Sequence, residues 1–273
     1  MDARLQRRVQ RYGWDRAAGH YTRYWRVQLA PAQETLLAMA ALTPGERVID
    51  IACGTGLVSI PAARAVGPDG ELLGTDLSDT MVESARAEAA RADLSHARFE
   101  RMGAEKLAVP DAAFDAALCA LGLMYVPEPL EAAREMRRVL RPGGRAVAAV
   151  WGARDRCGWA GIFPVMDARV NTEVCPLFFR LGTGSTLART FSAAGFADID
   201  TVRISTRLEY ESEEDALGAA FAGGPVAMAY ARFHDRTREE AHAAYLETIA
   251  PFRRGEGYDI PGEFVIVRGI RPG

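Results

Sequence analysis

The stretch Val48–Gly56 constrains the fold most, because an apolar run there ends in an acid and passes directly into a turn of small residues. Residues 57–64 follow with the apolar spacing of a helix. Gly54 and Gly56 let the backbone turn sharply and let a ligand come close, and the N-terminus of the helix would face that ligand. Strand, turn and helix together predict a nucleotide-type cradle. Asp50 at the strand end would repel a pyrophosphate and suits a cationic or hydroxyl-rich ligand.

The same succession of strand and helix patterns continues along residues 46–151. Predicted strands span 47–51, 71–76, 97–101, 114–120 and 145–151, and predicted helices span 57–64, 78–91 and 127–140. This alternation predicts an α/β fold with a doubly wound, mostly parallel sheet. Right-handed crossovers then gather the carboxyl ends of the strands at one edge, where ligands bind in such folds. Asp50, Asp76 and Cys119 all lie at predicted carboxyl ends.

Outside this core the patterns are less regular. Residues 31–42, after an N-terminal helical segment, predict a separate helix with a proline near its start. Beyond residue 151 the sequence predicts a helix at 186–194, a strand at 198–208, a helical region at 212–254 interrupted at 223–225, and a last strand at 263–270.

Composition limits the class of protein. The 273 residues are 49% hydrophobic and 25% charged, which suits one large globular domain or one domain with an insertion. A net charge of −3 gives no reason to expect a polyanion partner. The single lysine, Lys106, excludes the glycine-lysine-serine/threonine phosphate loop.

Cysteine spacing and hydropathy point to a cytoplasmic setting. The four cysteines, at 53, 119, 157 and 175, lack C-x-x-C spacing, so we expect reduced thiols and neither a metal site nor a disulfide framework. The N-terminal residues have no apolar core of signal-peptide type. No apolar run reaches the ~20 residues of a membrane span.

The N-terminal residues 1–28 are rich in arginine and aromatic side chains, and part of the segment has helical spacing. One interpretation is a solvated helix that packs a few aromatic rings on the core. A second is a mobile lid whose rings close over a ligand. A third, a nucleic-acid-binding arm, is disfavoured because the arginines are spread out and no lysine accompanies them.

A nicotinamide-binding dehydrogenase fits the glycine turn poorly. Ala52 and Ser59 stand where the first and third glycines of the G-x-G-x-x-G pattern belong. Asp76 is well placed for a ribose, but Tyr125 is followed by Val-Pro-Glu-Pro, so no Tyr-x-x-x-Lys pair exists there.

Four motifs, taken in order, carry a more specific resemblance. They are the acid and small-residue turn at 50–56, the acid Asp76, the Gly-Ala-Glu at 103–105, and the Leu-Arg-Pro-Gly-Gly at 140–144. This set resembles the class I S-adenosylmethionine-dependent methyltransferases, and within them the ubiquinone/menaquinone-biosynthesis type. The resemblance is close over 44–151, loose around 14–25, and elsewhere limited to the order of elements. It implies a seven-stranded sheet whose last strand is antiparallel.

The resemblance also implies roles at the cofactor site. Asp50 would lie near the cofactor's ammonium, and Asp76 would accept hydrogen bonds from both ribose hydroxyls; the alternative for Asp76 is a helix N-cap, which Ser78 or Asp79 could provide. Ala52 replaces a usual glycine and is tolerable if its backbone dihedrals are ordinary. The implied cofactor-binding residues are Tyr21, Asp50, Ala52, Cys53, Gly54, Thr55, Gly56, Asp76, Leu77, Met81, Gly103, Ala104, Glu105, Ala120, Leu121 and Tyr125.

Methyl transfer from a sulfonium mainly requires alignment and exclusion of water. A general base is needed only for a poorly nucleophilic acceptor. His20 is the candidate base, with a plain surface histidine as the alternative. Tyr21 is the second catalytic candidate, as a residue closing over the cofactor. Glu105 is either an adenine contact or an exposed loop acid.

The acceptor pocket is expected from three stretches within one domain spanning 1–273: a lid at 1–30 and caps at 152–182 and 211–260. Their aromatic residues predict a small apolar or aromatic acceptor, which would be methylated on oxygen, nitrogen or carbon. The alternative for most of these aromatic residues is packing in the core. The protein is expected to be a monomer or a homodimer. A non-methylating cyclisation or isomerisation, or a nucleic-acid methyltransferase, remain alternative functions. The latter is disfavoured because residues 120–123 lack the Asn/Asp-Pro-Pro-Tyr motif, and Cys175-Pro176 lies too far past the strand at 114–120 to be a cytosine-attacking nucleophile.

Overall fold

A computed structural model describes residues 3–170, 177–224 and 226–273, so Cys175 and Pro225 lie outside the described residues. The strands are β1 Arg47–Ile51, β2 Glu71–Asp76, β3 Ala97–Arg101, β4 Phe114–Ala120, β5 Leu140–Trp151, β6 Ala197–Tyr210, β7 Arg253–Arg254 and β8 Gly257–Ile270. The α-helices are α1 Ala3–Ala40, α2 Ser59–Val66, α3 Asp79–Arg91, α4 Pro129–Val139, α5 Ile162–Asp167, α6 Thr186–Ala193, α7 Glu213–Phe221, α8 Ala227–Tyr230 and α9 Asp235–Ile249.

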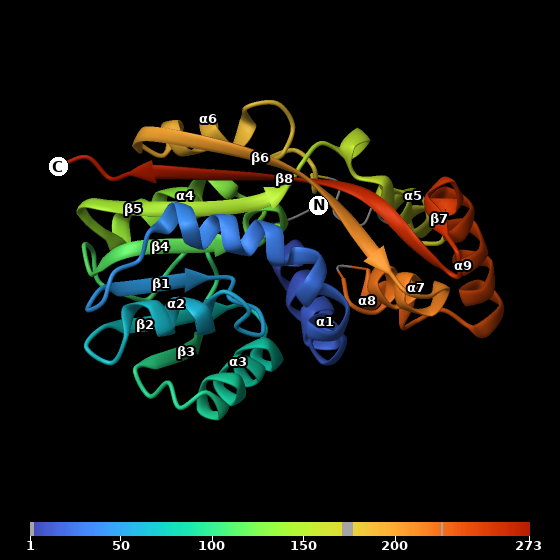
Figure 1. Ribbon diagram of the computed structural model, residues 1–273, viewed down its shortest axis with the longest axis horizontal. Coiled ribbons are helices and arrows are strands. Elements are labelled where there is room, and N and C mark those ends of the chain that lie inside the picture. The colour runs from blue at the N-terminus through green and yellow to red at the C-terminus, as the bar shows by residue number, and fades with distance from the viewer. Residues whose placement is uncertain (1–2, 171–176, 225) are drawn as a thin grey trace.

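The strands form one sheet in the order β3-β2-β1-β4-β5-β8-β6, and the two-residue β7 pairs with β8 (Figure 1). β1 to β5 run parallel, whereas β8 is antiparallel to both β5 and β6. The predicted doubly wound α/β fold with an antiparallel last strand is therefore confirmed, with β7 as a small addition to the seven expected strands.

The central strands are buried on both faces, as parallel strands must be when helices cover the sheet. Val48, Ile49 and Ile51 of β1 are fully buried, and residues 116–119 of β4 are equally inaccessible. Their carboxyl ends point toward the N-terminal half of α1, which lies just beyond the strand tips in Figure 1. The cap helices α7, α8 and α9 gather beyond the far end of β5.

Helix α1 is continuous, whereas the sequence predicted a break before Pro31. A proline inside a helix removes one backbone hydrogen bond and normally interrupts it. Here Leu29, Ala32 and Leu36, on both sides of Pro31, are buried in the core. Packing of this apolar face outweighs the missing bond, because tertiary contacts supply most of the stability of a protein helix.

Other boundaries also differ from the prediction: α2 lies two residues later than the predicted 57–64, and β6 extends beyond 198–208 at both ends. β5 begins at Leu140, five residues early, because Leu140 pairs with Phe114 ahead of a register shift. β8 begins at Gly257 instead of residue 263, because its first residues pair with the end of β6. The helical region at 212–254 is divided into α7, α8 and α9 and ends in β7.

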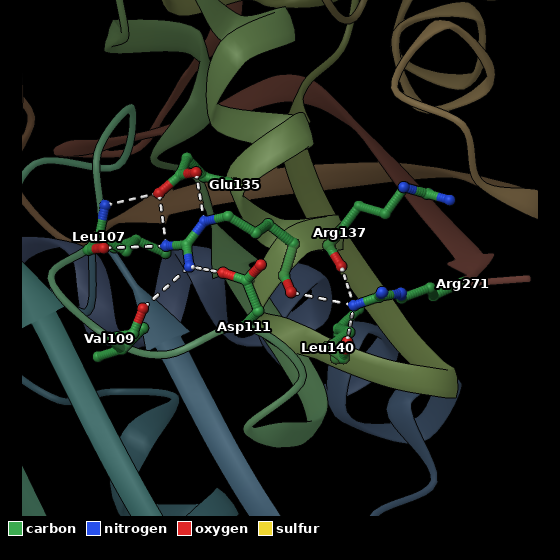
Figure 2. Close-up of polar contacts among 8 residues, drawn as sticks. Leu107, Val109, Asp111, Glu135, Arg137, Leu140 and Arg271 are labelled. Atoms are coloured by element: carbon green, nitrogen blue, oxygen red, sulfur yellow. Dashed lines mark hydrogen bonds and ion pairs between the residues drawn. The ribbon is translucent and has the colours of Figure 1, made fainter. Parts of the chain in front are cut away.

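The loop between β3 and β4 is fastened to α4 by the guanidinium of Arg138. This group donates to the carbonyl oxygens of Leu107 and Val109, each at 2.9 Å, and to both carboxylate oxygens of Glu135. It also donates to Asp111 at 2.6 Å, and Glu135 accepts from the backbone N–H of Leu107 (Figure 2). The network holds the loop that directly follows residues 103–105.

Within the described ranges, none of the helices combines the length and apolar character needed to cross a membrane. The same part of the chain contains no group of three or more His, Cys, Asp or Glu side chains arranged to hold a metal ion.

Candidate active site

A cavity of about 1060 Å³, counting its opening to solvent, lies at the carboxyl ends of the parallel strands. Its wall is mostly apolar and comes from α1, the turns after β1, β2, β3 and β4, the end of β5, and the two caps. The residues lining it are Arg7, Gln10, Trp14, Tyr21, Trp25, Leu29, Ala52, Gly54, Asp76, Leu77, Met81, Met102, Gly103, Ala104, Glu105, Ala120, Leu121, Gly122, Met124, Tyr125, Val126, Pro127, Trp151, Trp159, Gly223 and Gly224.

Asp76, at the end of β2, connects the glycine turn to the start of α3. Its Oδ2 accepts from the backbone N–H of Gly54 and its Oδ1 from that of Ser78, both at 2.9 Å. The N-cap of α3 is Ser78, whose hydroxyl accepts from the N–H of Met81 at 3.1 Å. Burial raises the pKa of Asp76 to about 6, although the two backbone hydrogen bonds favour its charged form. Asp76 thus remains on the cavity wall as a rigidly held carboxylate.

Asp50 has a different environment from the one that the sequence suggested. It is 1% exposed and does not line the cavity. Its Oδ2 accepts from the hydroxyl of Ser59 at 2.5 Å, and its Oδ1 has no partner among the described residues. Burial raises the pKa of Asp50 to about 7, against the effect of the Ser59 hydrogen bond. The acid therefore lies beneath the turn, away from the ligand space.

Ala52 does not have the ordinary backbone that was expected of it. Its φ is +57°, in the left-handed region that glycine adopts most easily. Gly122 makes this conformation possible, since a Cβ added there would lie 2.4 Å from the Cβ of Ala52. Leu121, which precedes Gly122 in the chain and also lines the cavity, has a positive φ of +60° as well. Strained backbone of this kind concentrates at functional sites.

The N-terminal half of α1 closes one side of the cavity. Arg7 forms an ion pair with Glu105, and Arg11 bonds to Asp79 at 2.5 Å. Asp15 accepts from the hydroxyl of Ser78 at 2.6 Å. These contacts join α1 to the turns after β2 and β3, so Glu105 is neither an exposed loop acid nor free of partners.

Tyr21 lies beside the glycine turn, with its ring 3.9 Å from where a Cβ of Gly54 would stand. Trp14 meets Tyr21 edge to face at 5.7 Å and Tyr125 at 5.0 Å. Burial, and then the charge of Asp76, raise the pKa of Tyr21, so its phenol is neutral. Its chemistry is therefore that of a hydrogen-bond donor and an apolar cover.

Most of the residues predicted for the site come together on this wall. Those that line it are Tyr21, Ala52, Gly54, Asp76, Leu77, Met81, Gly103, Ala104, Glu105, Ala120, Leu121 and Tyr125. Those that do not are His20, Asp50, Cys53, Thr55 and Gly56.

The residues away from the wall have structural contacts instead. His20 is exposed and stacks on Tyr24. Cys53 is buried. The hydroxyl of Thr55 meets that of Thr22 at 2.8 Å and so joins the turn to α1. Gly56 has a φ of +91°, which supports the turn itself.

Sequence reasoning missed Arg7, Gln10 and Met102. Arg7 and Gln10 lie on α1, where a helical arginine-rich pattern gave no sign of which residues face a ligand. Trp14 and Trp25 were noted only as aromatic residues of the N-terminal segment. Which residues of α1 face the cavity depends on the contacts of this helix with loops more than 60 residues away in the sequence.

Comparisons with known proteins identify what the core of this chain is similar to. Residues 48–144 match the family model described as a methyltransferase domain. The chain is 34% identical to the demethylmenaquinone methyltransferase of Listeria monocytogenes over 131 residues, 48% of this chain and 55% of that protein. Residues 48–144 are thus similar to a methyltransferase domain, and the chain resembles S-adenosylmethionine-dependent methyltransferases over this part. The resemblance to the quinone-biosynthesis type is supported by the same relative, although this chain spans only about half the length of the curated relatives it matches.

Solved structures share the fold over most of this chain. The YcgJ protein of Bacillus subtilis aligns with a TM-score of 0.62 at 21% identity, covering 89% of this chain and 99% of that one. The [4+2]-cyclase SpnF aligns with a TM-score of 0.57 at 22% identity, covering 89% and 80%. At these identities the likeness concerns the fold alone.

Proposed function

We propose that this protein transfers a methyl group from S-adenosylmethionine to a small apolar or aromatic metabolite. The observation that carries the proposal is the carboxylate of Asp76, held on the cavity wall by the N–H groups of Gly54 and Ser78. Each oxygen accepts one backbone hydrogen bond and keeps a further lone pair, so the two together suit the adjacent hydroxyls of a ribose.

The rest of the wall fits the other parts of the cofactor. Leu77, Met81 and Met102 offer apolar contacts to a flat base beside Asp76, and the exposed backbone of Gly54 suits the amino-acid end. Glu105 is held by Arg7 and by the N–H of Glu128, at 3.0 Å, next to this base site. When bound, S-adenosylmethionine supplies a methyl group that is already activated on a positive sulfur.

The role of the protein is then to align the acceptor and exclude water. Trp14, Tyr21 and Tyr125 form an aromatic cover on the α1 side of the cavity. Among the described residues of the wall, the carboxylates are Asp76 and Glu105, and no histidine is present. We propose that the acceptor loses its proton without a dedicated base, and that Tyr21 acts as a positioning residue.

The N-terminal residues 1–30 serve as the lid in this proposal, and 152–182 and 211–260 contribute the acceptor side through Trp159, Gly223 and Gly224. Two arginines of the lid that lie at the cavity side of α1 pair within the chain: Arg7 with Glu105, and Arg11 with Asp79. This pairing favours a lid over a nucleic-acid-binding arm.

Two measurements test the proposal. Titration calorimetry with S-adenosylhomocysteine should show saturable one-to-one binding that is about 100-fold weaker in Asp76→Ala. Incubation with S-adenosylmethionine and 1-naphthol as a trial acceptor, followed by mass spectrometry, should give a product heavier by one methyl group. Absence of cofactor binding would contradict the proposal. Product formation without methyl gain or cofactor consumption would instead favour a non-methylating cyclisation or isomerisation, a chemistry that the fold also accommodates in SpnF.

A further inference from the structure

Ser78, just before α3, connects two carboxylates from distant parts of the chain. Its backbone N–H donates to Oδ1 of Asp76 at 2.9 Å, and its hydroxyl donates to Oδ1 of Asp15 at 2.6 Å. Asp15 belongs to α1 and lies 63 residues before Ser78 in the sequence. Ser78 is fully buried, so its hydroxyl depends on this acceptor. The residue that holds the carboxylate of Asp76 is therefore itself held by α1.

Asp15 also contacts the backbone at the beginning of α3. The first N–H groups of a helix have no partner within that helix. The hydroxyl of Ser78 accepts from the N–H of Met81 at 3.1 Å, and Oδ1 of Asp15 accepts from the N–H of Thr80 at 3.5 Å. A negative charge at this end of a helix is also favoured by the helix dipole. The first turn of α3 is thus fixed jointly by its own cap and by a side chain of α1.

The position of Asp15 makes its connection to the cavity indirect. Among the described residues of the wall, Asp76 is present and Asp15 is not, whereas Trp14 and Tyr21 of the same helix are. The charge of Asp15 is nevertheless felt at Asp76: burial raises the pKa of Asp76, and Asp15 raises it further. Ser78 donates to both carboxylates, which offsets the repulsion between them.

We propose that Asp15 is a positioning residue of the cofactor site, which acts through Ser78 to hold the carboxylate of Asp76 toward the ribose. This contact exists while the N-terminal half of α1 lies over the strand ends, as it does in Figure 1. Closure of α1 and completion of the ribose site are then one event. The proposal rests on the proposed function and adds the residue that links the lid to ribose binding.

Calorimetric titration with S-adenosylhomocysteine tests Asp15 directly. Asp15→Ala leaves the buried hydroxyl of Ser78 without its acceptor and should weaken binding about tenfold. Asp15→Asn keeps an oxygen that can accept from Ser78 and should bind within about threefold of the wild type. Glu34→Gln is the control, because it removes a negative charge from an exposed position of the same helix and should bind normally.

A double-mutant cycle tests whether Asp15 acts through Ser78. Ser78→Ala removes the hydroxyl but keeps the N–H that donates to Asp76. In the Ser78→Ala background, Asp15→Ala should therefore weaken binding of S-adenosylhomocysteine little further, instead of by another factor of about ten. Thermal unfolding shows whether each variant is folded.

The pH profile provides a measurement that a purely structural contact would not change. Asp15→Asn removes a charge that raises the pKa of Asp76, so the fall in affinity at low pH should begin at a lower pH than in the wild type. The other ionisable groups around Asp76 are the same in both proteins. Those whose pKa is raised by burial and also by the charge of Asp76 are Tyr21, Asp50, Cys53 and Cys119, and those paired at the start of α3 are Arg11, Asp79 and Arg101.

The outcomes separate this proposal from the proposed function. Wild-type affinity in Asp15→Ala, additive losses in the cycle, or an unmoved pH profile in Asp15→Asn would overturn the role of Asp15. Faster association and dissociation with an unchanged dissociation constant would also overturn it, because Asp15 would then only fasten α1. If Asp15→Ala does not fold, the profile of Asp15→Asn decides alone. Failure of the wild-type protein to bind S-adenosylhomocysteine would instead overturn the proposed function.

Discussion

The backbone N–H of Gly54 donates to the carboxylate of Asp76 across 2.9 Å, joining the turn after β1 to the end of β2. The same carboxylate accepts from Ser78, so one side chain fixes both the glycine turn and the beginning of α3. Loss of this group would therefore affect the shape of the site as well as the ribose contact.

Replacing Asp76 with alanine should weaken binding of S-adenosylhomocysteine by about 100-fold, since charge-assisted hydrogen bonds contribute roughly 1.5–3 kcal/mol each. Calorimetric titration measures the change. Asp69→Ala, in the exposed turn before β2, is the control and should bind normally. A dissociation constant unchanged in Asp76→Ala would refute the ribose assignment.

Cofactor affinity should also depend on pH. Burial raises the pKa of Asp76 to about 6, and the charged form is the better acceptor for hydroxyl groups. Affinity should be constant above pH 7 and fall as the carboxylate takes up a proton below pH 6, toward tenfold per pH unit. In Asp76→Asn, which lacks the titrating carboxylate, this loss of affinity at low pH should disappear. A wild-type profile that is flat from pH 5 to 8 would argue against a carboxylate contact.

Asp50 should make the stability of the protein fall as the pH rises. Its folded-state pKa of about 7 exceeds the ordinary value of 3.8, so the folded state retains its proton where the unfolded state has lost it. Between these two values stability decreases with increasing pH, by a contribution on the order of 4 kcal/mol. Urea unfolding at pH 5 and pH 8 should show this loss in the wild type and a smaller one in Asp50→Asn. The same change in the free energy of unfolding between pH 5 and pH 8 in the wild type and in Asp50→Asn would contradict the prediction.

Ala52 and Gly122 should be energetically coupled. A Cβ on Gly122 would lie 2.4 Å from that of Ala52, so Gly122→Ala should destabilise the protein by about 1–3 kcal/mol through overpacking. Ala52→Gly alone should change stability by less than about 1 kcal/mol. Glycine relieves the backbone strain at φ +57°, but it also gives the unfolded chain more conformational freedom, and the two effects offset each other. The double variant should recover part of the loss. Strict additivity in denaturant unfolding would show that the two sites do not interact.

Arg138→Ala should destabilise the protein by roughly 2–4 kcal/mol, because it leaves Glu135 and two loop carbonyls without their donor. Arg134→Ala is the matched control on the same helix, since its ion pair with Glu131 is half exposed and contributes little. The hydrogen bonds from Arg138 lower the pKa of Glu135, so this stabilisation is present at neutral pH and is lost as the pH falls below about 4.5. Equal melting temperatures for the two variants would refute the prediction.

Much of the fold followed from local patterns. β1 to β4 occupy the predicted residues. The inner strands β1, β2 and β4 are largely apolar runs bounded by turns, as buried parallel strands are, whereas β3 is an edge strand in which only Phe99 is buried. The ends of β5 and β8 were not predictable, since their extra residues are strands only through pairing with Phe114 and with the end of β6. The continuity of α1 through Pro31 likewise depends on packing against the sheet.

The sequence by itself determined the alternation of strands and helices along the core and, with it, the edge at which the glycine turn, Asp76 and residues 103–105 meet. It did so because parallel strands share one carboxyl edge whatever their side chains. Only the tertiary structure decided that Asp76 faces the cavity while Asp50 lies under the turn with Ser59, that Ala52 is left-handed beside Gly122, and that Ser78 connects Asp76 to Asp15. These features depend on the direction of side chains and on contacts with residues distant in the sequence. Local periodicity contains no information about either.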